Sequence, residues 1–269
     1  MEIIEVFGYT CALIIGVILG LIGGGGSILA VPVLTYLFAV DEKTATAYSL
    51  FIVGASALIG GIKQYFKNLV DWRTAIVFGI PAILGVSIVR RFIVPALPDI
   101  LFTISDFEFT RRMGMLGLFS LLMIPAGISM LKTKKQALEK NNDNTYNYPL
   151  IFIEGIVVGA LTGFIGAGGG FLIIPALVIL AKTDIKVAIG TSLIIIALKS
   201  LSGFFLGDAL TMNINWPFLL SFTLLSFIGI FIGSYLSNFI DGKRLKKGFG
   251  YFIFLMAGFI FYMEFFIKQ

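Results

Sequence analysis

The sequence of 269 residues contains no histidine and a single cysteine, Cys11. The lack of histidine removes the commonest metal ligand and proton relay, and one cysteine cannot form an internal disulfide. The opening MEIIEVFGYT carries two acids and neither lysine nor arginine. It therefore lacks the basic region of a cleaved signal peptide, and we expect the N-terminus to be retained. We expect no metal site and no cofactor.

Charge is also scarce, at 13% of residues, while 58% are hydrophobic and the mean hydropathy is +1.00. A soluble globule of this length needs more polar surface, and several apolar runs are long enough to cross a bilayer of ~30 Å. The composition predicts a multi-pass membrane protein. Its net charge of +5 is spread over short loops, so it carries topology information and does not indicate nucleic-acid binding.

The sequence does contain an internal repeat. Residues 16–60 recur 143 positions later, with 18 identities in 45 pairs and no gap, centred on GLIGGGGSILAVP and GFIGAGGGFLIIP. With a shift of one residue, Asp71-Trp72 then aligns with Asn215-Trp216. We predict two homologous transmembrane units, 1–131 and 148–269, joined by a polar linker at 132–147. Such duplication with paired helix breaks is typical of secondary transporters.

The predicted fold is all-α, with about eight hydrophobic segments in two repeats. The segments cover 6–39, 44–62, 73–94, 113–131, 148–181, 187–206, 215–239 and 248–267. The first and fifth, of about 34 residues each, are too long for one crossing and contain the glycine clusters. Glycine costs a helix roughly 1 kcal/mol relative to alanine, so each long helix should break at its cluster. Broken backbone cannot face lipid, and must be buried or line a cavity.

Loop charges distinguish two topologies. If each long segment crosses once, the repeats are parallel and the two sides hold 11 and 8 basic residues. If each is a re-entrant hairpin, the repeats are inverted and the split is 13 to 6, with the linker on the basic side. The inverted arrangement follows the positive-inside rule better. It places Arg90, Arg91, Arg111 and Arg112 outside, near Asp99, Asp106 and Glu108.

The glycine clusters are the first candidate binding site. A helix that begins inside the membrane, at Ser27 or Gly170, offers free N–H groups and a partial positive charge to an anion. The candidate residues are Gly23, Gly24, Gly25, Gly26 and Ser27 in the first unit, and Gly166, Gly168, Gly169 and Gly170 in the second. The alternative is close helix packing, which we expect for Gly16-x-x-x-Gly20 and Gly159-x-x-x-Gly163. Packing does not by itself predict three or four glycines in succession.

Lys199 is the second candidate, because a cation well inside an apolar run is costly. Its alternatives are a side chain that reaches toward the interface or one paired with Asp208. Ser49, Thr191 and Ser192, at equivalent positions of the two repeats, could bind an oxyanion or join helices. Asp41 and Asp184 fit helix N-caps, and Trp72 and Trp216 fit interfacial anchors.

These residues resemble the TauE/SafE family of sulfite and organosulfonate exporters, also called the toluene-sulfonate uptake permease family. The resemblance lies in the segments 20–27 through Pro32 and 163–170 through Pro175, in Ala188-Ile-Gly-Thr-Ser-Leu193, and in the Asp-Trp and Asn-Trp pairs. It covers nearly the whole chain. It implies a bacterial inner-membrane transporter of small, sulfur-containing or other anions. The chain departs from the pattern at Tyr48, where threonine is more typical, and in the charged insertion at 90–112.

Three function classes follow. A secondary transporter of small anions fits the duplication, the paired breaks and Lys199. An anion channel would use the same donors without coupling. An intramembrane enzyme would need Ser-Lys chemistry from Ser192 and Lys199, because histidine is absent, and we predict no catalytic residues.

Overall fold

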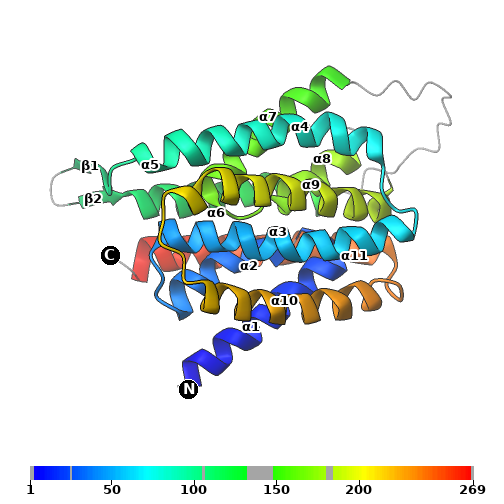
Figure 1. The fold of residues 1–269 in the computed structure, drawn as a ribbon, viewed down its shortest axis with the longest axis horizontal. Helices are drawn as coiled ribbons and strands as arrows, with labels where there is room; N and C mark the ends of the chain where they lie inside the picture. Colours follow the sequence, from blue (N-terminus) through cyan, green and yellow to red (C-terminus); the bar gives the residue numbers. More distant parts are fainter. Residues whose placement is uncertain (1–2, 25, 105–106, 132–147, 180–183, 268–269) are drawn as a thin grey trace.

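The computed structural model describes residues 3–24, 26–104, 107–131, 148–179 and 184–267 (Figure 1). The first unit contains α1 (Ile3–Ile22), α2 (Gly26–Pro32), α3 (Glu42–Phe66), α4 (Trp72–Ile88), α5 (Val94–Ala96), β1 (Ile100–Ile104), β2 (Phe107–Thr110) and α6 (Arg111–Leu131). The second contains α7 (Tyr148–Ile165), α8 (Gly170–Ile179), α9 (Ile185–Leu206), α10 (Trp216–Leu236) and α11 (Gly242–Tyr262). π-helical turns extend α2, α4 and α11 at Val33–Leu37, Val89–Ile93 and Met263–Ile267, and a 3₁₀ turn at Asp208–Leu210 follows α9.

The protein is an all-α membrane protein apart from the two short strands. Within the described residues, six helical stretches are long and apolar enough to cross a membrane: Glu42–Phe66, Trp72–Ala96, Arg111–Leu131, Ile185–Leu210, Trp216–Leu236 and Gly242–Phe266. In α3 and α9, 72% of the apolar window is buried inside the protein, against 39–44% in the other four. The core therefore lies around α3 and α9, and the other four present apolar side chains to lipid.

Helix starts follow the predicted capping. The Asp41 side chain accepts a hydrogen bond from the Thr44 N–H at 2.9 Å, and Asp184 accepts one from the Lys186 N–H at 3.2 Å. Each satisfies a backbone donor that has no acceptor within its own helix. The N-cap prediction for both aspartates is confirmed.

Helices that precede residues 132–147 pack in pairs with helices that follow them. α1 packs on α10 and α7 packs on α4, while α3 pairs with α9 and α6 with α11. Glycines make the first two contacts close: a Cβ on Gly20 would lie 2.5 Å from the Ile230 carbonyl oxygen, and one on Gly163 would lie 3.0 Å from the Val86 Cα. The predicted packing role of these two glycines, in Gly-x-x-x-Gly pairs, is confirmed.

The bundle has two distinct ends. At the first, which we call the hairpin end, the start of α3 meets the β-hairpin and α6 (Figure 1). At the second, the linker end, the Lys67 ammonium donates to the Asn238 side chain at 2.8 Å, which joins the end of α3 to the end of α10. α9 starts at the linker end, since a Cβ on Gly242 would contact Ile185. α3 and α9 therefore run in opposite directions.

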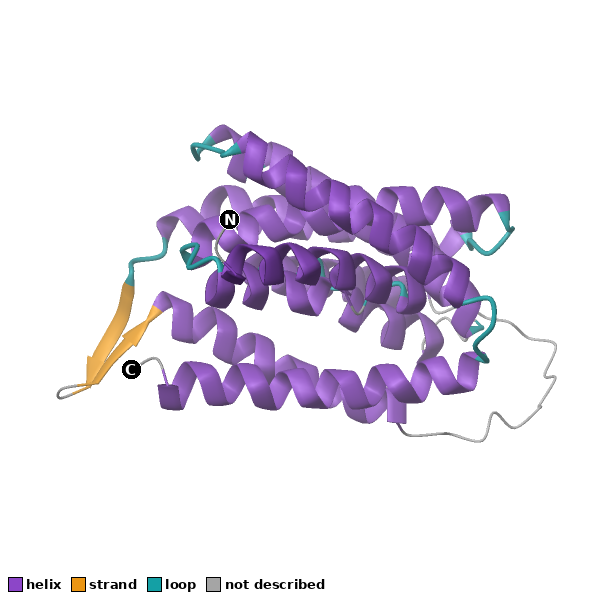
Figure 2. Cartoon of the chain, turned by 90° about the horizontal axis from the view of Figure 1, so that it is seen from below, coloured by secondary structure: helices purple, strands orange, loops and turns teal. Residues whose placement is uncertain are grey.

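The β-hairpin was not predicted from the sequence. β1 and β2 pair antiparallel, with Phe102 opposite Phe109 and their rings stacked at 4.7 Å. The hairpin projects beyond the helices (Figure 2). The charged insertion at 90–112 therefore has three parts: its first residues continue α4, its middle contains the hairpin, and Arg111 and Arg112 begin α6.

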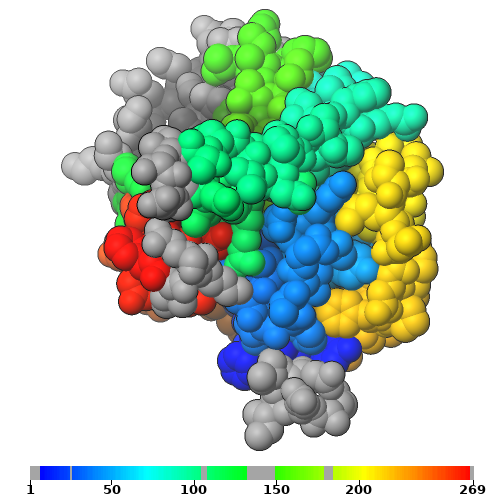
Figure 3. Space-filling model, turned by 90° about the vertical axis from the view of Figure 1, so that its left-hand side faces the viewer, coloured from blue at the N-terminus to red at the C-terminus, as the bar shows by residue number. Residues whose placement is uncertain are grey.

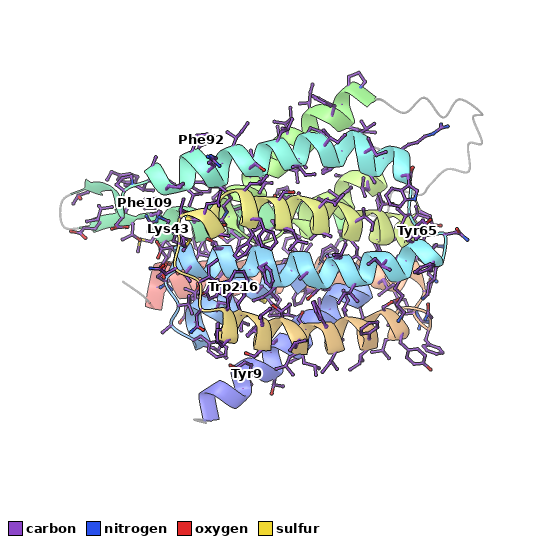
Figure 4. All side chains as sticks on the ribbon, viewed as in Figure 1. Tyr9, Lys43, Tyr65, Phe92, Phe109 and Trp216 are labelled. Carbon is purple, nitrogen blue, oxygen red and sulfur yellow. The ribbon has the colours of Figure 1, made fainter. Side chains whose placement is uncertain are left out.

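Charge is distributed unequally between the ends. Every salt bridge among the described residues lies at the hairpin end, where Arg111 joins Glu42 at 2.6 Å and Asp99 at 2.9 Å, and Arg112 joins Glu264 at 2.8 Å. Seen from that end, the start of α3 lies between α6 and the connection after α9 (Figure 3). Lys43 and Phe109 lie toward this end, and Tyr65 lies at the other (Figure 4).

The linker end instead gathers lysines. Burial and the charges of Lys63 and Lys186 lower the pKa of Lys67. The positively charged N-terminal segment of α11 begins a few residues after Asn238, so it lies at the linker end as well.

Candidate functional site

The second break, residues 166–169, separates α7 from α8. Three of its residues have positive φ, namely Gly166 (74°), Gly168 (64°) and Gly169 (71°), which side-chain-bearing residues rarely adopt. The N–H groups of Leu172 and Ile173 donate to the Gly169 carbonyl, whereas those of Gly170 and Phe171 have no backbone acceptor among the described residues. α8 begins at Gly170, where the sequence placed it.

Lys199 lies against this second break. It is fully buried on α9, and its ammonium donates to the Thr162 hydroxyl in the last turn of α7. A Cβ on Gly169 would lie 2.9 Å from the Lys199 Nζ atom. The alternatives of a lysine reaching the interface or pairing with Asp208 are both wrong for this structure, since the side chain is 0% exposed and Asp208 pairs with Arg90.

The first break, at Gly23 and Gly24, lies between α1 and α2. Gly23 has a φ of 79°, and the buried Ser27 hydroxyl donates to the Gly24 carbonyl at 2.6 Å. α2 starts at Gly26, one residue before the predicted Ser27. Gly25 lies outside the described residues. This break faces neutral groups, because a Cβ on Gly23 would lie 2.7 Å from the Ile189 side chain.

The two breaks touch each other in the middle of the bundle. A Cβ on Gly24 would lie 2.5 Å from the Gly170 carbonyl carbon, and one on Gly168 would lie 3.2 Å from the Ser27 Cβ. Gly26 packs in turn on Leu19 of α1. Among the described residues, close packing and positive φ together give a structural reason for Gly23, Gly24, Gly26, Gly166, Gly168, Gly169 and Gly170. This reason does not depend on whether an anion binds there.

Some of the candidate hydroxyl groups hold neighbouring helices together, and Thr191 is one of them. The Thr191 hydroxyl accepts a hydrogen bond from the Asp71 N–H at 2.8 Å, and Tyr48, its repeat equivalent, accepts one from the Asn215 N–H at 2.7 Å. These two hydroxyls hold the starts of α4 and α10 against α9 and α3. Of the two roles considered for Thr191, the structure therefore shows the joining of helices. Tyr48, in place of the more typical threonine, fills the same role.

The two serines differ in whether the fold uses their hydroxyl groups. Ser192 donates to the Ile189 carbonyl at 2.9 Å and lies 3.4 Å from the Gly23 carbonyl. The hydroxyl of Ser49 is buried and has no hydrogen-bond partner among the described residues. Of the predicted hydroxyls, Ser49 is therefore the one whose hydrogen-bonding capacity the fold does not use.

The structure adds a charged pair that the sequence analysis missed. Arg90, placed there among outward loop charges, is only 1% exposed and lies on the continuation of α4. Its NH1 atom lies 3.3 Å from the Asp208 Oδ1 atom and donates to the Thr46 hydroxyl at 3.1 Å. The apolar residues that follow Arg91 were the available signal, since they indicate that the helix continues past both arginines.

The chemistry of this region is that of hydrogen-bond donors and positive charge. Among the described residues, no group of three or more cysteine, aspartate or glutamate side chains is placed to hold a metal ion. Lys199 and the N-terminus of α8 together suit a small anion.

Comparison with known proteins finds a matching family model and several similar membrane proteins. The family model described as "Sulfite exporter TauE/SafE" matches residues 9–260. A Xylella fastidiosa protein called "Probable membrane transporter protein" is 30% identical over 91% of this chain and 90% of its own length. A Bacillus subtilis protein, "Probable membrane transporter protein YdhB", is 26% identical over 87% of this chain and 91% of its own length. No solved structure matches the chain significantly.

Proposed function

Because the chain belongs to the sulfite exporter TauE/SafE family, we propose that it carries small anions and binds them at the second break beside Lys199. The protein is a multi-pass membrane transporter. The proposed substrates are sulfite, sulfonates and similar sulfur-containing anions. The observation that carries the proposal is the burial of Lys199 against the break without a carboxylate partner among the described residues.

The physical argument concerns charge compensation. A buried, unpaired ammonium has lost its hydration, at a cost of several kcal/mol, and one hydroxyl does not replace it. The positive end of the α8 dipole points toward the same place and makes the local excess of positive charge larger. A bound anion would offset both. We include Ser49 in the proposed site because its buried hydroxyl has no partner among the described residues.

We also propose that the two units are inverted repeats and that each begins with a re-entrant hairpin, α1–α2 and α7–α8. The exchanged packing of α1 on α10 and of α7 on α4, together with the opposite directions of α3 and α9, supports this arrangement. The linker end would be cytoplasmic, because the inverted arrangement puts 13 lysines and arginines on that side and 6 on the other.

A secondary transporter fits this structure better than a channel does. At the contact between Gly24 and Gly170, backbone packs directly on backbone, which favours a transporter whose helices move over an open pore. A channel needs an open path between the two sides. The Ser-Lys enzyme has no support, because Ser192 donates to the Ile189 carbonyl while Lys199 contacts Thr162.

Counter-flow tests the proposal. Purified protein would be reconstituted into liposomes loaded with unlabelled sulfite, sulfate or an organosulfonate, and uptake of the labelled anion would be followed. We expect transient accumulation of at least one anion, and no single-channel conductance in planar bilayers. Uptake no faster than in protein-free liposomes for the whole panel would contradict the proposal.

A further inference from the structure

Arg90 has unused hydrogen-bonding capacity in a buried position. A guanidinium carries five N–H donors, and in this structure only NH1 has partners, Asp208 and Thr46. The Nε and NH2 atoms of Arg90 have no partner among the described residues, and neither does the Oδ2 atom of Asp208. A buried donor without an acceptor costs free energy, and three N–H groups of a cation are in that position here.

The unused edge of Arg90 faces the second break. A Cβ on Gly166 would contact the NH2 atom, just as one on Gly169 would lie 2.9 Å from the Lys199 Nζ atom. Two buried cations therefore lie against the two ends of the same short loop. Arg90 lies on the side of the hairpin end, since Asp208 follows the end of α9 there.

The two buried cations have no charged counterparts at the equivalent positions of the sequence repeat. In the register that aligns Asp71 with Asn215, Arg90 corresponds to Ser234, and Lys199 corresponds to Ser56 at the offset of 143. Both counterparts are neutral, and the first break meets Ile189 where the second meets Thr46 and Arg90. The positive charge of the core is thus concentrated at the second break.

We propose that Arg90 is a second anion-binding residue, which receives the anion between Lys199 and the hairpin end, and that Asp208 holds the guanidinium while no anion is bound. The proposal rests on the anion transport proposed above. The Nε and NH2 donors are parallel, so they suit two oxygens of one oxyanion and not a spherical halide. The ligand class is therefore an oxyanion with at least two equivalent oxygens, and the Asp208 carboxylate occupies the opposite side of the fork.

Kinetic measurements on variants test this assignment. Counter-flow of labelled sulfite and sulfate would be measured for the parent, Arg90→Lys, Asp208→Asn, and the double variant Arg90→Met with Asp208→Asn. We expect Arg90→Lys to raise KM about tenfold, because it keeps the charge but loses the parallel donors. Asp208→Asn should lower KM several-fold, because the negative charge that offsets the guanidinium is removed. Arg91→Lys is the matched control and should behave as the parent, since Arg91 is exposed and contacts the Leu206 carbonyl and the ring of its neighbour Phe92.

The double variant separates binding from a purely structural ion pair. If the pair only holds α4 to the end of α9, neutralising both partners restores the KM of the parent, and the proposal is wrong. If Arg90 binds the anion, KM remains raised about tenfold although the protein is folded. Should the double variant fail to fold, Arg90→Lys decides, because a parent-like KM there also overturns the proposal. If the parent protein transports no anion, the proposed function itself is wrong. If the parent transports anions and the variants have its KM, only the proposed role of Arg90 is wrong.

Discussion

Gly24 and Gly170 are in contact where the two broken helices meet, and neither position has room for a side chain. A Cβ on Gly24 would approach the Gly170 carbonyl carbon to 2.5 Å. Backbone atoms cannot give way as the end of a flexible side chain can. This contact brings the first break against the start of α8, next to the residue, Gly169, that lies against Lys199.

We therefore predict that Gly24→Ala destabilises the protein by about 1–3 kcal/mol, the usual cost of overpacking. Thermal unfolding in detergent would measure the effect. Gly248→Ala and Gly258→Ala are the controls, because a Cβ at either position in α11 meets nothing within 4 Å. They should unfold at or above the temperature of the parent, since alanine favours a helix. Equal unfolding temperatures for Gly24→Ala and the controls would show that the breaks do not touch.

A second prediction concerns which end is cytoplasmic. In a variant with Cys11 replaced, single cysteines would be introduced at the exposed positions Asn213 and Asn238, which lie at the hairpin and linker ends. An impermeant thiol reagent added to intact cells should label Asn213→Cys and leave Asn238→Cys unmodified. Broken cells should give labelling of both. Labelling of Asn238→Cys but not of Asn213→Cys in intact cells would contradict the proposed orientation.

The hydroxyl groups give a third prediction, in which one variant loses stability and another loses transport. Thr191→Val removes the acceptor for the Asp71 N–H and should cost about 1 kcal/mol of stability. Ser49→Ala removes a hydroxyl without a partner among the described residues, so unfolding should change little. If Ser49 contributes to the anion site, its KM should rise in counter-flow. An unchanged KM for Ser49→Ala would exclude it from the site.

The sequence predicted the elements that depend on local signals. Asp41 and Asp184 cap the helices expected of them, and α2 and α8 restart within one residue of the predicted positions. These features follow from capping chemistry and from the poor helix propensity of glycine. The alternation of apolar and polar residues in Phe107-Glu108-Phe109-Thr110 was an equally local signal for a strand, and the charged residues beside it obscured it.

The remaining features depend on tertiary contacts that no local pattern contains. Arg90 is buried because the chain brings Asp208, 118 positions later, against it. Thr162, the partner of Lys199, lies 37 positions before it in another helix. The duplicated glycine clusters identified the region of the candidate site, but the internal repeat gave no indication that both buried cations face the second break.

Substitution of Lys199 by methionine is the most direct test of the proposed anion site. Lys199→Met removes the charge while keeping an apolar stem in a fully buried position, so unfolding in detergent should show a folded protein. Lys199→Arg should keep part of the activity, because the charge persists with a different geometry. Lys186→Met, on the exposed first turn of the same helix, is the matched control. We predict that folded Lys199→Met loses counter-flow of sulfur oxyanions while Lys186→Met retains it; counter-flow by Lys199→Met at the rate and KM of the parent would contradict the account.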